Sequence, residues 1–273
     1  MSRLPTYFIS HGGGPWPWIK DLLPGDWTLL ESSLRAIPSQ LGTTPTAVLA
    51  VSAHWERQEF TLQTAPSPPT LHDYGGFPDF TYAIQYPAPG SPAVAERTGE
   101  LLSRAGLRWG TDDRRGFDHG TFVPLHVIYP DAEVPVLQLS IRSGYDPAAH
   151  IEVGRAIAPL RDEGVLILGS GLSYHNLTAI GPVGVQPSAG FDNWLHETLV
   201  DHVGATRSER LLRWESAPGA RRSHPSADHL IPLMVAVGAA EDDPATLTYH
   251  DTDLMGSGIT ASSFGFGLRT QPA

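Results

Sequence analysis

The distribution of apolar residues divides the chain into short apolar runs and longer stretches with a helical period. Runs rich in β-branched, aromatic and aliphatic residues fit buried strands, because such side chains pack well on a pleated surface. We therefore predict strands at residues 6–10, 46–52, 60–63, 82–86, 134–139, 165–168, 246–249 and 262–266. Helices are predicted at residues 92–105, 148–161, 190–203, 208–214 and 225–240.

Strands that alternate with helices indicate an α/β fold with a largely parallel sheet. We predict a three-layer α/β/α arrangement around a central, mostly parallel mixed sheet, in a single domain that spans residues 1–273. In the last predicted helix, Pro225 is expected at the first position and Pro232 is expected to introduce a kink.

The acidic composition narrows the possible functions. A formal net charge of -11 and a pI near 5.4 argue against a general affinity for nucleic acid or for anionic membranes. The chain contains no cysteine, so a bound metal would depend on histidine, carboxylate or water. No signal-like segment opens the chain and no apolar run reaches the length of a membrane span, so we expect a cytoplasmic protein.

Three of the twelve histidines follow predicted strands. His11 comes directly after the first strand and before three glycines, His54 follows the second strand, and His175 lies shortly after the strand at residues 165–168. The carboxyl ends of parallel strands border the ligand crevice of open α/β sheets, so these side chains are expected to converge. His229, one turn into the last predicted helix, could complete a metal site.

Each of these histidines also has a structural interpretation, because a histidine after a strand is often a hydrogen-bonded loop residue. His224 is five residues from His229, which places the two on different faces of a helix, so we expect it at a cap, behind a ligand or against substrate. His196-Glu197 lacks the second histidine of the H-E-x-x-H zinc motif. His175 replaces the closing glycine of a serine-hydrolase elbow. We expect five further histidines to be surface or packing residues: His126, His150, His196, His202 and His250.

Seven short motifs then follow one another along the chain. They are I-S-H-G-G-G-P at residues 9–15, S-A-H-W-E at 52–56, D-Y-G-G-F-P at 73–78, Y-P-A-P-G at 86–90, G-F-D-H-G at 116–120, G-S-G through H-N-L at 169–177, and H-P through His229 at 224–229. This ordered set resembles the class III extradiol ring-cleavage dioxygenases. It is most similar to the branch of the DOPA extradiol dioxygenases, which is related to the catalytic subunit of protocatechuate 4,5-dioxygenase.

The resemblance implies an enzyme that binds one divalent metal and uses O₂ to open a catechol ring next to the diol. Fe(II) is the metal expected for activity, and Zn(II) is also possible. The resemblance further implies that His11 and His54 are metal ligands, that His175 is the catalytic acid/base and that His119 is a second catalytic histidine.

The resemblance places His229 where the catalytic subunit of protocatechuate 4,5-dioxygenase has a glutamate ligand. The resemblance therefore implies a metal held by His11, His54 and His229, three imidazoles in place of a two-histidine, one-carboxylate triad. Asp228 would supply the carboxylate if the alignment shifted by one residue.

Aromatic residues near the motifs are expected either to form an apolar slot for the catechol ring or to pack in the core; they are Trp16, Trp18, Trp55, Tyr74 and Phe77. Candidates to hold a substrate carboxylate are Arg142, Arg221 and Arg222. Two further classes of function use the same histidines: a zinc hydrolase, and a non-catalytic relative similar to the Memo-type proteins. The sequence is compatible with a monomer and with a homo-oligomer.

Overall fold

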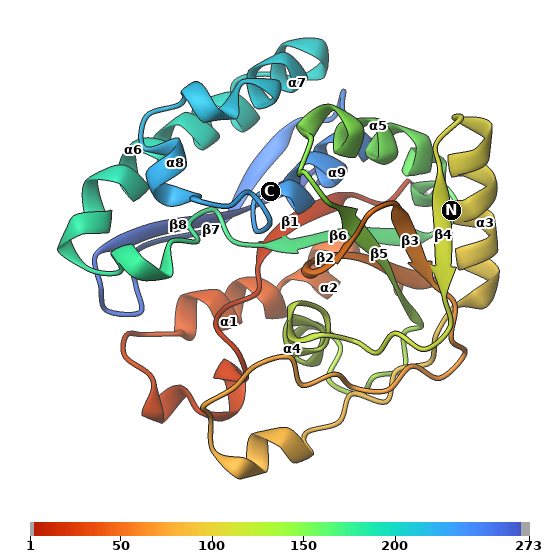
Figure 1. The fold of residues 1–273 in the computed structure, drawn as a ribbon, viewed down its shortest axis with the longest axis horizontal. Helices are drawn as coiled ribbons and strands as arrows, with labels where there is room; N and C mark the ends of the chain where they lie inside the picture. Colours follow the sequence, from red (N-terminus) through yellow and green to blue (C-terminus); the bar gives the residue numbers. More distant parts are fainter. Residues whose placement is uncertain (1–2, 269–273) are drawn as a thin grey trace.

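An eight-stranded mixed sheet crosses the molecule in the order β4-β3-β5-β2-β6-β1-β8-β7 (Figure 1). The computed structural model describes residues 3–268. The four central strands β5, β2, β6 and β1 are parallel, whereas β8 and β7 extend one edge in antiparallel pairing. The strands are β1 (Thr6–Ser10), β2 (Ala47–Arg57), β3 (Phe60–Gln63), β4 (Trp109–Asp112), β5 (Val136–Arg142), β6 (Val165–Gly171), β7 (Ala245–Leu254) and β8 (Ile259–Phe266).

Helices cover both faces of the sheet, so the predicted mixed α/β architecture is confirmed (Figure 1). The α-helices are α1 (Thr28–Arg35), α2 (Ile37–Leu41), α3 (Pro92–Arg104), α4 (His119–Ile128), α5 (Pro147–Ile157), α6 (Pro182–Val200), α7 (Gly204–Leu212), α8 (Ala220–Ser223) and α9 (Ile231–Ala239). Short 3₁₀ helices are η1 (Trp16–Trp18), η2 (Lys20–Leu22), η3 (Asp79–Ala83), η4 (Ala158–Arg161), η5 (Leu177–Ala179) and η6 (Trp214–Ser216).

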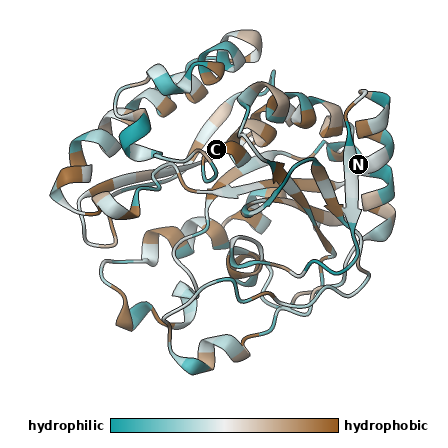
Figure 2. Cartoon of the chain, viewed as in Figure 1, coloured by the Kyte–Doolittle hydropathy of each residue, from teal (hydrophilic) through white to brown (hydrophobic). Residues whose placement is uncertain are grey.

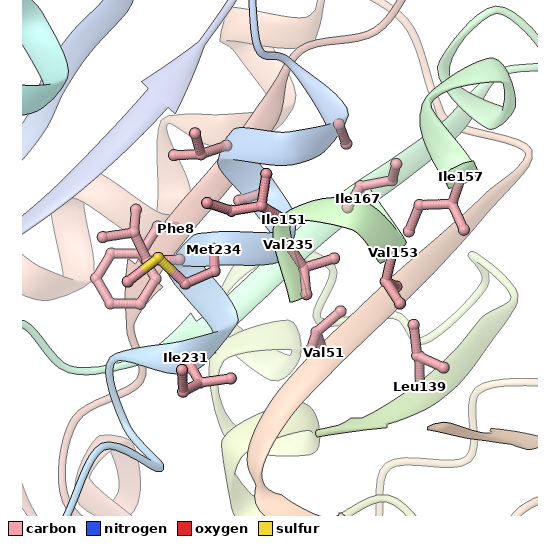
Figure 3. Packing of buried hydrophobic residues seen from close by; sticks show 14 of the residues in the cluster. Phe8, Val51, Leu139, Ile151, Val153, Ile157, Ile167, Ile231, Met234 and Val235 are labelled. Atoms are coloured by element: carbon pink, nitrogen blue, oxygen red, sulfur yellow. The ribbon is translucent and has the colours of Figure 1, made fainter. Parts of the chain in front are cut away.

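Alternation of side chains along the central strands gives the sheet a hydrophobic core on each face. In β6, Ile167 packs in the core beneath α5 and α9, while Leu166 and Leu168 pack in the core beneath α1 and α4. Figure 3 shows Ile167 among residues of the first core. Hydrophobic residues concentrate in the central strands, and the peripheral helices carry hydrophilic patches (Figure 2). This packing fixes the strands whose ends carry the site.

The predicted strand at residues 82–86 is wrong. The chain there forms η3 and then an extended segment outside the sheet. The carbonyl of Thr81 accepts a hydrogen bond from the Tyr74 hydroxyl at 2.8 Å, and the Thr81 hydroxyl donates to the carbonyl of Pro78 at 2.7 Å. These local bonds and the aromatic contacts between Tyr74 and Tyr82 hold the segment as a loop.

The last predicted helix begins later than expected. Residues 225–230 form a turn, and α9 starts at Ile231. Pro232 therefore lies in the first helical turn, where a missing N–H costs nothing, and it does not introduce the predicted kink. The consequence for the site is that His229 stands in the turn before α9 and not within a helix.

Several elements escaped the sequence prediction: α1, α2, α4, α8 and β4. The α4 segment is buried on nearly all sides, so it lacks the polar face by which an amphipathic helix is recognised. Strand β2 extends to Arg57, which places His54 inside the strand at a break in its pairing with β5. Within residues 3–268 we find no helix that combines the length and the apolar character needed to cross a bilayer.

Candidate metal centre

His11 lies at the carboxyl end of β1, where the Gly-rich turn begins. Its backbone N–H donates to the carbonyl of Gly171 at 3.1 Å, which continues the pairing of β1 with β6. Its ring Nδ1 lies 2.8 Å from the carbonyl oxygen of Gly12. Gly12 has φ +79°, and a Cβ there would lie 2.3 Å from the Trp16 ring. Glycine is therefore needed for Trp16 to pack beneath the loop and donate its indole N–H to the His11 carbonyl.

His54 is held by a buried polar network at the irregular end of β2. Its backbone N–H donates to the Ser52 hydroxyl at 3.2 Å, and that hydroxyl donates to Asp118 at 2.6 Å. Arg115 donates both to the carbonyl of His54 and to Asp118. The His54 Nδ1 lies 3.7 Å from a carboxylate oxygen of Asp73. These contacts fix the backbone and turn the ring toward the crevice.

His229 reaches the same crevice from the turn before α9. Its carbonyl accepts a hydrogen bond from the N–H of Leu172 at 3.0 Å, which ties the turn to the end of β6. Its Nδ1 lies 2.9 Å from Asp228 Oδ2. Asp228 thus contacts the outer nitrogen of His229 and does not join the inner cluster of ring nitrogens.

The inner nitrogens of these three rings converge. The Nε2 atoms of His11 and His54 are 3.3 Å apart, and those of His54 and His229 are 3.2 Å apart. Nitrogens that each lie about 2.1 Å from one ion, at the angles of tetrahedral or octahedral geometry, are separated by about 3.0–3.4 Å. The spacing therefore suits a common divalent ion.

The protonation states also suit a cation. With Nδ1 donating to Gly12 or Asp228, a neutral His11 or His229 presents the lone pair of Nε2 to the crevice. Burial, followed by the nearby imidazoles, lowers the pKa of His11 well below its usual value and that of His54 to about 2. Lone pairs that face one another repel, and a metal ion between them removes that repulsion.

Two further histidines flank this cluster. The ring of His175 stacks on that of His229, with centroids 3.4 Å apart, and burial lowers its pKa to about 4. The ring of His119 lies 3.8 Å from that of His54, and its Nδ1 is 2.8 Å from Asp73 Oδ1. Asp73 also accepts the backbone N–H of His119 at the start of α4. Both rings line the cavity above the three converging nitrogens.

Asp73 and Asp228 both act on ring nitrogens from behind the site. Burial is the largest influence on each carboxyl and opposes its ionisation, but the hydrogen bond from the neighbouring histidine and the attraction to the nearby imidazoles together outweigh burial and lower the pKa. Two anions therefore face the outer nitrogens of His119, His54 and His229. Asp73 stands in the D-Y-G-G-F-P motif, but its contacts with His119 and His54 were not predicted from the sequence.

A cavity of about 390 Å³ opens above the histidines. Its wall contains the three glycines after His11 and side chains that come from four segments of the chain: Leu23, Trp27, Phe77, Leu172, Leu177, Leu254 and Met255. Phe77 packs on Gly14, where a Cβ would lie 2.6 Å from the ring. Apart from Phe77, these side chains were missed, because nothing in their local sequence distinguishes them from ordinary loop or packing residues.

The other candidate aromatic residues lie outside the cavity wall. Trp16 stacks on Trp27 behind the glycine loop. Trp55 is buried next to Arg115, and Tyr74 lies beside Phe77 with its hydroxyl bonded to Thr81. Trp18 packs against Phe122 and His126.

His224 and the three arginines considered for binding a substrate carboxylate also lie outside the cavity wall. His224 is buried at the end of α8, where its Nε2 lies 2.9 Å from the carbonyl of Ser173, and burial lowers its pKa to about 3. Arg142 pairs with Asp146, and Arg221 pairs with Glu215. Within residues 3–268, neither these two arginines nor Arg222 line the cavity.

The fold and this cluster of histidines at the strand ends define an α/β protein with a candidate metal centre. Residues 20–267 match the family described as the catalytic LigB subunit of aromatic ring-opening dioxygenase, and the chain belongs to this family. The resemblance inferred from the seven motifs is thereby confirmed, and the protein is an extradiol aromatic ring-opening dioxygenase.

Individual relatives agree with the family. The chain is 41% identical over 254 residues to the 4,5-DOPA dioxygenase extradiol of Beta vulgaris, with 91% of both chains covered. It is 36% identical over 260 residues to the protein of the same name from Escherichia coli (strain K12), with 93% of this chain and 92% of that one covered. A crystal structure of an uncharacterized protein from Escherichia coli K12 superposes with a TM-score of 0.78 at 31% identity, covering 97% of this chain and 100% of the other.

Proposed function

We propose that this enzyme incorporates both atoms of O₂ into a catechol and opens the ring next to the diol, with His11, His54 and His229 as the ligands of one divalent metal. The observation that carries the proposal is the convergence of three Nε2 atoms, 3.2 and 3.3 Å apart in the two neighbouring pairs, at the base of a cavity. Asp228 and the Gly12 carbonyl orient two of the rings from behind.

Fe(II) is the metal we propose, because it is the ion that this family typically uses. When bound, it supplies open positions at which a catechol and O₂ can meet. Three histidines are neutral donors, so the site keeps the full charge of a divalent ion. That charge favours a catechol in its anionic form. Zn(II) accepts the same ligands but lacks the redox chemistry.

His175 is the proposed proton acceptor for a catechol hydroxyl. Burial and the neighbouring His229 keep its ring neutral at pH 7, since its pKa is lowered to about 4. A neutral imidazole at the cavity wall can take a proton and return it later in the reaction. Stacking on His229 at 3.4 Å fixes the plane of the His175 ring next to the metal ligands.

His119 is proposed to contact an oxygen of the substrate. Asp73 accepts a hydrogen bond from Nδ1 of His119, so Nε2 is the nitrogen left to face the cavity. The same carboxylate accepts the first free N–H of α4, which locks the ring relative to the helix. Trp27 and Phe77 line the same cavity and would limit the water around a bound catechol ring.

The test is oxygen uptake after the purified protein has been loaded with Fe(II) without air. Catechol addition should consume one O₂ per ring and produce the yellow absorbance of a ring-opened semialdehyde. His175→Gln should lower the turnover rate by about a hundredfold, as expected for a general acid/base, while metal content is kept. His196→Gln, at an exposed histidine on α6, is the matched control.

Metal content tests the ligand assignment separately. His11→Ala, His54→Ala and His229→Ala should each bind less than one tenth of the metal that the unaltered protein binds. Undiminished metal in any of these variants would refute the assignment of that histidine. Full turnover in His175→Gln would refute its role in proton transfer.

A further inference from the structure

The part of the cavity that faces the histidines is apolar. Its side chains are leucine, methionine, phenylalanine and tryptophan, contributed by residues 23–27, 77, 172–177 and 254–255. Gly25 brings two of these segments together, because a Cβ there would lie 2.5 Å from the backbone nitrogen of Gly256. Among residues 3–268, no lysine, arginine or carboxylate side chain lines this wall. A substituent on a bound catechol ring that points away from the proposed metal ligands therefore contacts apolar side chains.

The apolar surface continues from the cavity to the outside. Leu177 lines the cavity and is 71% exposed. The chain that follows it exposes further large hydrophobic side chains: Ile180, Val183 and Val185. Val185 lies against the turn that joins β7 to β8, since a Cβ on Gly258 would be 3.0 Å from it. Leu177 thus joins the cavity wall to the surface, and the apolar wall together with Leu177 is here called the apolar entrance.

Away from the proposed metal ligands, no cationic side chain among residues 3–268 lines the cavity wall to pair with an anionic substituent. Asp73 and Asp228 are both acidic and are already hydrogen-bonded to ring nitrogens. The chain has a formal net charge of -11, which repels anions at long range. Arg142 and Arg221, which were candidates to hold a substrate carboxylate, form ion pairs with acidic side chains outside the cavity.

We infer that the substrate of this enzyme is a catechol that carries an uncharged, apolar substituent, alkyl or aryl. This inference rests on the proposed function, which supplies the diol end of the substrate. An apolar substituent gains by leaving water at the apolar entrance, whereas a carboxylate or a zwitterionic amino acid loses its hydration there without a partner. The substrate class thus differs from the DOPA of the relatives' printed names.

A pair of ligands of similar shape tests the inference. In 4-isobutylcatechol the side chain is neutral, and in 3,4-dihydroxyphenylacetate a carboxylate takes the place of the branched end. We would measure the Kd of both, and of DOPA, by titration calorimetry on the Zn(II)-loaded protein, and oxygen uptake on the Fe(II)-loaded protein. The neutral ligand should bind at least about tenfold more tightly than either charged ligand.

A variant at the entrance sharpens the test. Leu177→Lys adds a cation at an exposed position of the cavity wall. The Kd of 3,4-dihydroxyphenylacetate divided by that of 4-isobutylcatechol should then fall by about threefold or more. Leu212→Lys, at an exposed leucine of α7 outside the cavity, should leave the ratio unchanged.

The outcomes separate this inference from the proposed function. Equal or tighter binding of the charged ligands to the unaltered protein overturns the apolar substrate class, whatever the turnover. Absence of oxygen uptake with all three catechols overturns the proposed function. The Kd values still decide which substituent the cavity accepts.

Discussion

Gly171 is the residue through which the strand scaffold sets the position of a proposed metal ligand. It is the last residue of β6, and a Cβ built on it would lie 2.0 Å from the carbonyl oxygen of His229. Real Cβ contacts stay beyond 3.0 Å, so in Gly171→Ala the His229 backbone must retreat by about 1 Å or more. Metal ligands tolerate a displacement of only about 0.2 Å.

We expect two measurable effects. Overpacking should lower the free energy of unfolding by about 1–3 kcal/mol, and the displaced His229 should reduce metal affinity by about tenfold to a hundredfold. Urea denaturation measures the first, and competition with a coloured chelator for Zn(II) measures the second. The side chains of His11 and His54 are unchanged in this variant, so residual binding by two ligands should persist.

Two controls separate the loss of stability from the loss of metal. Gly99→Ala brings a Cβ to 2.4 Å from the Trp109 ring, far from the site, and should destabilise the fold while the Zn(II) affinity stays constant. Gly110→Ala in β4 has its nearest neighbour at 3.8 Å and should change neither quantity. If Gly171→Ala keeps the full Zn(II) affinity, the contact between β6 and the His229 turn does not position a ligand.

Three further predictions concern the outer nitrogen of His229, a buried histidine and the core. Asp228→Asn should reduce Zn(II) affinity by about tenfold in the chelator assay, because a neutral amide makes the His229 imidazole less basic; an unchanged affinity would refute this. Burial lowers the pKa of His150 to about 4, so its contribution to stability is complete above pH 6.5 and is lost as pH falls toward 4. The resulting loss, about 2 kcal/mol at pH 5 relative to pH 7.5 in urea denaturation, should disappear from the pH dependence of His150→Gln. Leu139→Ala, at a fully buried site in β5, should lower the free energy of unfolding by about 2–5 kcal/mol, and a loss below 1 kcal/mol would contradict the packing shown in Figure 3.

The sequence was informative where local pattern and tertiary packing agree. The central strands were predictable because they are buried on both faces and read as continuous apolar runs, as at residues 165–168. The segment at residues 82–86 has the same strand-forming residue types, yet hydrogen bonds and aromatic contacts of Tyr74 hold it outside the sheet. Residue type alone does not reveal whether a neighbouring strand is free to pair.

In the candidate site, too, some residues could be predicted from the sequence and others could not. Strand ends and family motifs together pointed to His11 and His54, and the structure brings both to one place with His229. The helix expected to carry His229 is a turn there, since α9 begins only at Ile231 and Pro232 lies in its first turn, where a kink was predicted. The apolar wall was beyond prediction, since Leu23, Trp27 and Leu254 meet only through the folding of distant loops.

The place of β1 in the sheet has a consequence for biosynthesis. Strand β1 lies between β6 and β8, whose residues follow it in the sequence by more than 150 positions. His54 and His229 are themselves 175 positions apart. A nascent chain that has not been synthesised as far as His229 therefore lacks both β8 and the last of the three histidines. The proposed metal site can form only after His229 has been synthesised, and such long-range contacts make folding slow compared with that of chains built from local contacts.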